Sequence, residues 1–150
     1  MNHDLLKEMI DRHEGNRLKK YRCPAGHWTI SRGWNIDARA LPVDIASYLR
    51  LYGEITPAMS DRLLNIAIDT AVAQCRSIWP DFENFSERRQ LALADFIYNV
   101  GAGTALKFRK ALAAIEEGDW NKAAREMEDS NYYKQVPNRA KEIVEMVRNG

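Results

Sequence analysis

Cysteine and histidine are scarce in this chain. Its 150 residues include two cysteines, Cys23 and Cys75, and three histidines. Two cysteines are too few for a disulfide scaffold, so we expect both thiols to be free in a reducing compartment. The histidines, at positions 3, 13 and 27, lack the spacing of metal ligands. We therefore predict no metal site and no cofactor.

A long apolar run is also absent. The chain opens with MNHDLLKEMIDR, a charged amphipathic helix pattern that is typical neither of a signal peptide nor of a membrane span. We expect no stable membrane insertion, and a protein that is cytoplasmic on synthesis until another factor releases it.

The chain lacks a strong charge of either sign. Its 22 basic and 21 acidic residues leave a formal net charge of +1, which gives no case for a nucleic-acid partner. Residues 1 to 39 carry eight Lys or Arg against five acids. This mild bias suits an anionic polymer, although a solvated face is the simpler explanation of any one of these charges.

Apolar residues, by contrast, are plentiful and recur at steps of three and four, which predicts helices. A chain of this length with 45% hydrophobic residues can form one compact domain, or two small lobes that share a helix. Strand character is confined to a hairpin at 21–35, so the predicted class is α+β, mostly α. The expected helices cover about 3–13, 43–51, 57–78, 87–98 and 105–115, the last of these capped by Thr104, and two more begin at Asp119 and Pro137.

The stretch from His13 to Trp34 places an acid, a thiol and a hydroxyl in short order. Glu14 precedes Gly15, which favours a helix stop and directs the carboxyl out of the helix terminus. Cys23 opens the turn sequence Cys-Pro-Ala-Gly, and Thr29 follows in a segment with strand character.

This segment resembles a known family. The pattern Glu, eight residues, Cys, five residues, Thr, within EG-x-RL-x-x-Y and WTI-x-x-G, is similar to the catalytic segment of the phage-type lysozymes, the muramidases of T-even and lambdoid phages. The resemblance continues through YNVGAG at 98–103 and QVPNRAKEIV at 135–144, and covers most of the chain. It departs at Cys23, which is Asp in some members, at Ser31, usually Gly, and at Trp34, usually His.

The resemblance implies a single lysozyme-like domain over residues 1–150. An N-terminal lobe of about 13–58 would be joined by a helix of about 57–78 to a helical C-terminal lobe of about 79–150, packed with helix 3–13. The implied activity is that of an endolysin, a monomeric muramidase that hydrolyses the β-1,4 bond between N-acetylmuramic acid and N-acetylglucosamine in peptidoglycan. Such an enzyme acts on the bacterial cell wall, for host lysis by a phage or prophage.

The same resemblance assigns roles to individual residues. Glu14 would be the general acid, although an exposed Glu at a helix end is the ordinary reading of the residue alone. Arg139 would lie beside this acid and position its carboxylate. Substrate-binding roles fall to Asn35, Tyr98 and Asn99, while core packing explains Tyr98 equally well.

Cys23 has three readings. It could hold the attacking water together with Thr29, which would make the reaction inverting and which we favour. It could attack C1 as a thiolate, a less usual glycosidase nucleophile. It could also be a small buried hydrophobe, the commonest fate of a free Cys, just as Thr29 could be an ordinary strand residue.

The other two departures carry structural expectations. Trp34 would replace one half of a polar pair, with Ala67 as the other half, by an apolar contact. Ser31 would cost about 1 kcal/mol if its φ is positive, or would crowd the substrate beside Thr29 if it is extended, so that Ser31→Gly would raise activity.

Two other kinds of function stay open from the sequence. One is a non-catalytic peptidoglycan-binding or scaffolding module on a lysozyme fold, which the departures at Cys23, Ser31 and Trp34 motivate. The other is a helical adaptor without a glycan role, which the Glu14, Thr29 and PNRA matches argue against. Trp28, Trp79 and Trp120 are predicted to be core residues.

Overall fold

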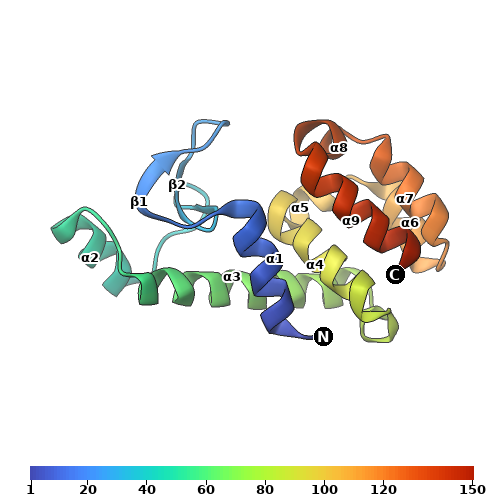
Figure 1. The fold of residues 1–150 in the computed structure, drawn as a ribbon, viewed down its shortest axis with the longest axis horizontal. Helices are drawn as coiled ribbons and strands as arrows, with labels where there is room; N and C mark the ends of the chain where they lie inside the picture. The colour runs from blue at the N-terminus through green and yellow to red at the C-terminus, as the bar shows by residue number, and fades with distance from the viewer. The chain divides into compact units, whose positions relative to one another are not determined.

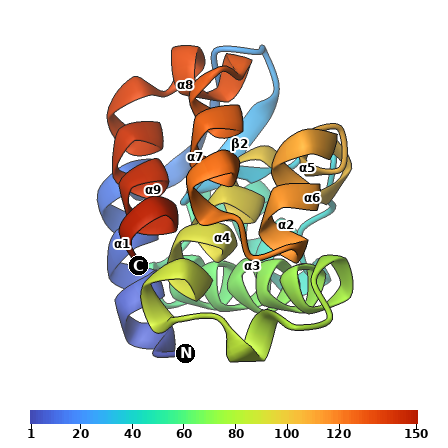
Figure 2. The same cartoon turned by 90° about the vertical axis from the view of Figure 1, so that its right-hand side faces the viewer.

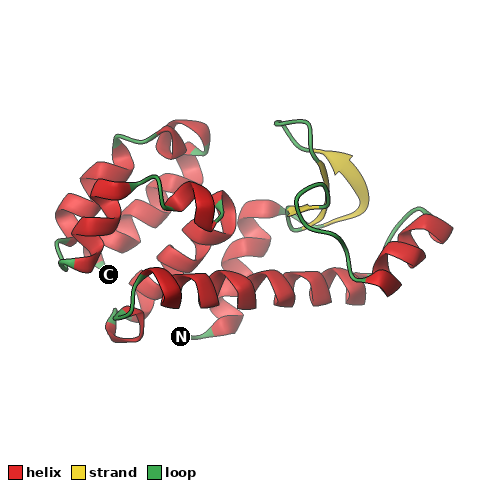
Figure 3. Cartoon of the chain, turned by 180° about the vertical axis from the view of Figure 1, so that it is seen from behind, coloured by secondary structure: helices red, strands yellow, loops and turns green.

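The computed structural model describes residues 1–150 and confirms an α+β fold that is mostly helical (Figure 1). Its only sheet has three short strands near the N-terminus, drawn in yellow in Figure 3. The elements in chain order are α1 (His3–Glu14), β1 (Arg17–Arg22), β2 (Trp28–Ser31), β3 (Trp34–Asn35), α2 (Val43–Tyr52), α3 (Pro57–Ile78), η1 (Phe82–Asn84), α4 (Glu87–Val100), α5 (Ala102–Ala105), α6 (Arg109–Glu116), α7 (Trp120–Glu128), α8 (Asn131–Gln135) and α9 (Pro137–Asn149). None of the helices combines the length and the apolar content that a membrane span requires.

The chain forms two compact units. The smaller unit is Lys7–Ile68, and the larger unit joins Met1–Leu6 to Asp69–Gly150. The chain passes from one unit to the other within α1 and again within α3. The larger unit is therefore discontinuous in sequence, and the Asn2 backbone N–H ties its first segment to Glu87 with a hydrogen bond of 2.9 Å.

The sheet of the smaller unit is antiparallel, in the order β1-β2-β3. Thr29 in β2 pairs with Tyr21 in β1 and with Asn35 in β3. The strand region begins at Arg17, earlier than the predicted position 21. An irregularity of the β1–β2 register between Arg17 and Tyr21 removes the alternation of buried and exposed residues from β1, so no period of two marks the strand in the sequence.

The smaller unit has its own apolar core. Trp34 is 6% exposed within it, and Ala67 packs against the same cluster, which confirms the predicted apolar contact. The indole Nε1–H of Trp34 donates to the backbone carbonyl of Arg39 at 2.9 Å, so burial leaves this donor satisfied. The buried members of the cluster are Ile30, Trp34, Leu41, Ile45, Ile55 and Leu63.

Side-chain caps mark the starts of α3 and α7, whereas Thr104, the cap predicted from the sequence, lies inside α5. The Thr56 hydroxyl accepts from the Met59 backbone N–H at 3.1 Å, and the Asp119 carboxylate accepts from the Lys122 N–H at 3.1 Å. The single helix predicted over 105–115 is wrong. It is divided into α5 and α6, because Phe108 leaves the helical region at φ −81° and ψ 55° while its ring packs on that of Phe96 at 5.2 Å.

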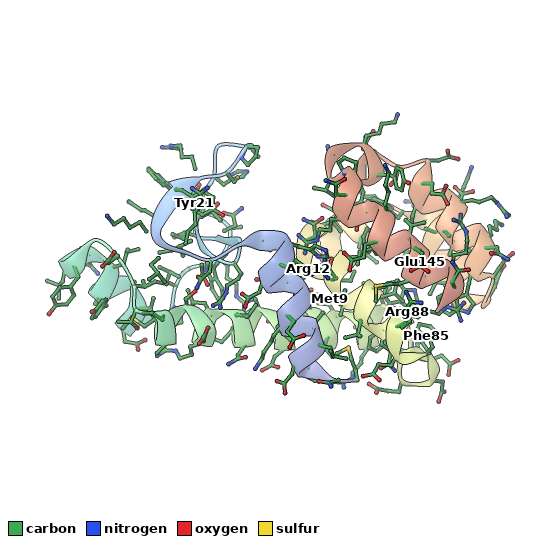
Figure 4. The ribbon with its side chains drawn as sticks, viewed as in Figure 1. Met9, Arg12, Tyr21, Phe85, Arg88 and Glu145 are labelled. Atoms are coloured by element: carbon green, nitrogen blue, oxygen red, sulfur yellow. The ribbon has the colours of Figure 1, made fainter.

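In the larger unit, α9 lies against α4, α7 and α8 (Figure 2). An Arg88–Glu145 ion pair of 2.6 Å links α4 to α9, and both residues are labelled in Figure 4. Trp79 is buried as predicted. The prediction is wrong for Trp28 and Trp120, which are only half-buried and carry the cationic groups of Lys20, Arg22 and Arg89 on their rings.

Candidate active site

Glu14 is the last residue of α1, and the helix ends there because Gly15 turns the chain at φ 70°. The carboxylate is half-buried and rests against the backbone of Gly33. A Cβ at position 33 would lie 2.6 Å from Glu14 Oε2, closer than atoms can pack, and Gly33 also has a φ of 77°. The backbone conformation favours glycine at this position, and an added Cβ would displace the Glu14 carboxylate, which is the end of a flexible side chain.

Tyr21 in β1 lies close to the proposed acid; its position is labelled in Figure 4. Burial raises the pKa of its phenol, and the negative charges of Glu14 and Cys23 raise it further, while Arg17 acts in the opposite direction. The Arg17 guanidinium carbon lies 4.4 Å from the ring centre. Tyr21 thus interacts with both the acid and the thiol. The sequence analysis missed this residue, although it is the Tyr of the EG-x-RL-x-x-Y motif.

Cys23 begins the turn between β1 and β2. Its backbone N–H donates to the His27 carbonyl at 2.9 Å, and its carbonyl accepts from the Gly26 N–H at 2.8 Å. The thiol is half-buried, so the reading of Cys23 as a buried hydrophobe is wrong. Hydrogen bonding to the backbone of His27 lowers the pKa of the thiol and outweighs the opposing effect of burial, with a smaller contribution from the backbone of Ala25. This environment favours a thiolate.

Thr29 in β2 is 4% exposed and adjoins Cys23. Its hydroxyl donates to the His27 carbonyl at 3.0 Å, so its oxygen lone pairs remain able to accept. Asn35 pairs with Thr29 across the sheet and is half-buried. Its side-chain oxygen accepts from the Ala38 N–H at 3.0 Å, which gives Asn35 a turn-stabilising contact in addition to any role toward a ligand.

Ser31 adopts a positive φ of 61°, as one of the two expectations for it required. The other expectation, that its side chain crowds a substrate beside Thr29, is wrong. Ser31 is 1% exposed and its hydroxyl lies 2.5 Å from that of Ser60 in α3. The Ser60 hydroxyl donates onward to Asn16 Oδ1 at 2.6 Å, so Ser31 belongs to a buried polar cluster of the smaller unit.

Arg32 extends this cluster and connects three parts of the smaller unit. Its guanidinium lies 2.6 Å from Asp11 in α1 and 2.9 Å from Asp61 in α3, and it also donates to the Ser60 hydroxyl at 3.0 Å. The Arg32 side chain is 7% exposed. Because Asp11 precedes Glu14 by one helical turn, these bonds help to fix the end of α1 that carries the acid.

The remaining predicted site residues belong to the larger unit. Arg139 in α9 is buried and donates through Nε to Asp95 Oδ1 at 2.8 Å. Tyr98 and Asn99 are half-buried in the last turn of α4. Glu14 belongs to the smaller unit, so its pairing with Arg139 stays a prediction.

No group of three or more His, Cys, Asp or Glu side chains is arranged to hold a metal ion. The chemistry available in the smaller unit is that of a carboxyl group, an acidified thiol and a threonine hydroxyl near one phenol. A carboxyl group that can donate a proton, together with acceptors that can orient water, is the set that hydrolysis of a glycosidic bond requires.

Comparison with known proteins agrees with this chemistry. A "Probable T4-type lysozyme 2" of Dictyostelium discoideum is 27% identical over 97% of this chain and 94% of its own length. A "Probable T4-type lysozyme 1" of the same organism is 25% identical with the same coverage. The "Pre-baseplate central spike protein Gp5" of Enterobacteria phage T4 is 28% identical over 97% of this chain, which corresponds to 28% of the spike protein. The family model "Phage lysozyme" matches residues 11–144, and the chain therefore belongs to the phage lysozyme family of glycosidase-type enzymes.

Proposed function

We propose that this protein is a muramidase that hydrolyses the β-1,4 bond between N-acetylmuramic acid and N-acetylglucosamine in peptidoglycan, and that it serves bacterial lysis for a phage or prophage. The observation that supports the proposal is that the family match spans Glu14 at the end of α1, Cys23 at the start of the β1–β2 turn and Thr29 in β2. The candidate acid and the candidate water-binding group thus belong to one neighbourhood of the smaller unit, on elements held together by the sheet and the Arg32 bonds.

In the proposed reaction Glu14 donates its proton to the glycosidic oxygen as the bond from that oxygen to C1 breaks. A water molecule gives one hydrogen bond to the Cys23 thiolate and one to the Thr29 oxygen, which leaves a lone pair on the water directed at C1. When the new bond to C1 forms, one water proton passes to the Cys23 sulfur. Exchange with solvent then returns a proton to Glu14 and removes one from Cys23.

This scheme predicts inversion at C1, because water attacks the face opposite the departing oxygen in one displacement. NMR of freshly released product measures the anomer. Cys23→Asp is expected to keep substantial activity with the same inverted product, since a carboxylate also accepts from water. A retained anomer would instead favour a covalent bond between the Cys23 sulfur and C1.

The larger unit is proposed to contribute Arg139, Tyr98 and Asn99 to the substrate side of the site, and Asn35 to contribute from the smaller unit. Support for the non-catalytic alternative is weaker than the sequence suggested. Two of the three departures that motivated it, Ser31 and Trp34, are buried within the smaller unit. Neither side chain is available to obstruct a glycan.

The decisive experiment is the release of reducing ends from purified peptidoglycan by the wild type, Glu14→Gln and Glu8→Gln. Glutamine keeps the shape of the side chain but has no proton to give, so Glu14→Gln is expected to lose activity while its thermal unfolding stays unchanged. Glu8 is exposed on the same helix and provides the matched control, which should retain activity. Wild-type activity in Glu14→Gln would remove the acid from the mechanism.

A further inference from the structure

The Arg32 side chain is buried although it carries a charge. It is 7% exposed, whereas its two acidic partners, Asp11 and Asp61, are 49% and 64% exposed. Burial of a guanidinium costs desolvation free energy that its ion pairs often only balance, and an apolar side chain of similar volume commonly gives equal stability. Stability alone therefore does not account for an arginine at this position. Arginine differs from an apolar residue in that it forms several hydrogen bonds in a fixed planar geometry.

Arg32 lies in the tight connection between β2 and β3. Its neighbours Ser31 and Gly33 both have a positive φ, of 61° and 77°. The connection meets the last turn of α1 at two consecutive residues. Arg32 Nε donates to Asp11 Oδ1 at 2.6 Å, and the backbone of Gly33 contacts the Glu14 carboxylate. Asp11 and Glu14 are three residues apart and share one face of the helix, so a single turn of the chain holds both.

The chain that follows Glu14 is held by the same cluster. Asn16 comes two residues after the acid, and its side-chain oxygen accepts from the Ser60 hydroxyl at 2.6 Å. Ser60 is 0% exposed, and its hydroxyl accepts from Arg32 at 3.0 Å. Glu14 is therefore bracketed, because Asp11 before it and Asn16 after it both connect to Arg32, the second through Ser60.

The links from Arg32 to the two helices are not equivalent. Two neighbouring residues of α3, Ser60 and Asp61, share the guanidinium, so that the loss of one leaves the other. The link to α1 runs through the Asp11 carboxylate. It acts on the last turn of the helix, and helix ends are the parts that open most readily. A change at Asp11 should therefore disturb the acid more than the same change at Asp61.

We propose that Arg32 is a positioning residue of the reaction. Through the last turn of α1 and the backbone of Gly33, it fixes the Glu14 carboxyl relative to β2, the strand that carries Thr29 and leads directly into the connection. The separation between the acid and the hydroxyl is thereby set within the smaller unit. This inference rests on the proposed muramidase function, in which a misplacement of about 1 Å can cost about a hundredfold in rate.

Substitution of the two acidic partners provides a matched test. Asp11→Asn and Asp61→Asn make the same chemical change at the same guanidinium. Asp11→Asn is expected to lower kcat on soluble wall fragments by about tenfold with KM within about twofold, whereas Asp61→Asn should lower kcat by less than about threefold. Arg32→Met should lower kcat at least as much as Asp11→Asn. Arg62→Gln is the control with wild-type kcat, because it removes a bidentate pair with Asp44 that joins α2 to α3.

A purely structural role for Arg32 predicts a different result. Asp11 and Asp61 both remain accessible to water, so their asparagine variants should fold and should show similar thermal unfolding. Assays well below the unfolding temperature then compare fully folded proteins. A structural role predicts kcat values that follow stability, and hence equal values for the two asparagine variants.

Hydrogen exchange at Gly15 tests the positioning without turnover. The Gly15 N–H donates to the Asp11 carbonyl at 3.0 Å and closes the last turn of α1. Asp11→Asn and Arg32→Met are expected to lower its protection by about tenfold, with other amides of the smaller unit unchanged, whereas Asp61→Asn should leave it near the wild-type value.

The two measurements separate this inference from the function on which it rests. A wild type that releases no reducing ends from peptidoglycan would remove the proposed function, while exchange at Gly15 would still decide whether Arg32 holds the end of α1. Three results would overturn the positioning role: equal kcat in Asp11→Asn and Asp61→Asn, a loss in Arg32→Met that lies entirely in KM, or Gly15 protection that Asp11→Asn leaves unchanged.

Discussion

Glu14 rests on the backbone of Gly33, so a side chain at position 33 would displace the Glu14 carboxylate. We predict that Gly33→Ala lowers kcat on peptidoglycan by about a hundredfold. The added methyl would lie 2.6 Å from Glu14 Oε2, so the carboxylate of the proposed acid must move. The positive φ of 77° adds a cost of about 1 kcal/mol in the free energy of unfolding.

Gly53→Ala is the control for this prediction. Gly53 has a φ of 76° and no atom within 4 Å of an added Cβ, so alanine causes the same backbone strain without the contact to the acid. Urea unfolding should show similar losses of stability for both variants. Equal activity of Gly33→Ala and Gly53→Ala would contradict the proposed placement of Glu14.

The lowered pKa of Cys23 leads to a pH dependence. Because the pKa of the thiol falls below its ordinary value of about 8.5, the thiolate is present at lower pH than in a free cysteine, and activity should increase with pH as the thiol ionises. A carboxylate in Cys23→Asp is ionised above about pH 4. The ratio of wild-type to Cys23→Asp activity should therefore increase with pH until the thiol is fully ionised, and this increase should occur below the pH at which an ordinary cysteine ionises. A constant ratio would show that thiol ionisation has no part in the reaction.

Ser31→Gly is now expected to leave activity unchanged, because Ser31 is buried against Ser60. Relief of the positive φ should raise the free energy of unfolding by about 1 kcal/mol, and loss of the buried hydrogen bond should lower it by about as much. The thermal unfolding temperature should therefore change little. Ser60→Ala should lower the free energy of unfolding by about 1–3 kcal/mol, since the Ser60 hydroxyl forms hydrogen bonds with Asn16, Ser31 and Arg32. A marked gain of activity in Ser31→Gly would restore the view that the serine obstructs the site.

Among single residues, motif spacing identifies Glu14, Cys23 and Thr29 as candidate site residues, and their catalytic roles stay predictions. It did not predict Gly33 or Tyr21 as site residues. Their importance depends on a contact across a turn and on a charge interaction between strands, and neither distance is encoded in the spacing of residues along the chain. The burial of Ser31 was missed for a related reason, since its partner Ser60 follows 29 positions later.

At the scale of elements, the ion pair of Arg139 and Asp95 connects α9 to α4. Asp95 is 0% exposed, so removal of the guanidinium takes a cationic partner from a fully buried carboxylate. We predict that Arg139→Ala lowers the free energy of unfolding by about 3–5 kcal/mol, whatever its effect on activity. A double-mutant cycle with Asp95→Ala in urea should give a large coupling energy. Additive losses would show that the pair contributes little to stability.

The long elements were predicted well and the short ones poorly. Helices α3 and α9 follow the expected proline positions, because Pro at the first turn and a sustained apolar period are local signals. Helix α8, with five residues, and η1, with three, are too short to show a period and were missed. The break between α5 and α6 depends on packing of Phe108 against Phe96, a tertiary contact.

At the scale of the molecule, the two thiols should report separately on the two units. Cys23 is half-buried in the smaller unit, while Cys75 is fully buried in the larger one and burial raises its pKa to about 12. We predict that one thiol per chain reacts rapidly with a chromogenic disulfide reagent at pH 8, and that the second reacts only as the larger unit unfolds. Cys23→Ser should abolish the rapid phase. Two rapid equivalents in the native protein would contradict the burial of Cys75.

The first six residues belong to a unit whose other members begin at Asp69. On a ribosome that adds roughly 5–20 residues per second, the smaller unit is complete several seconds before the larger one. During that interval Leu6, which is fully buried in the finished protein, has none of its partners from Asp69 onward. The proposed catalytic segment can therefore fold early during synthesis, whereas the N-terminal turn of α1 must wait until the segment from Asp69 onward has been made.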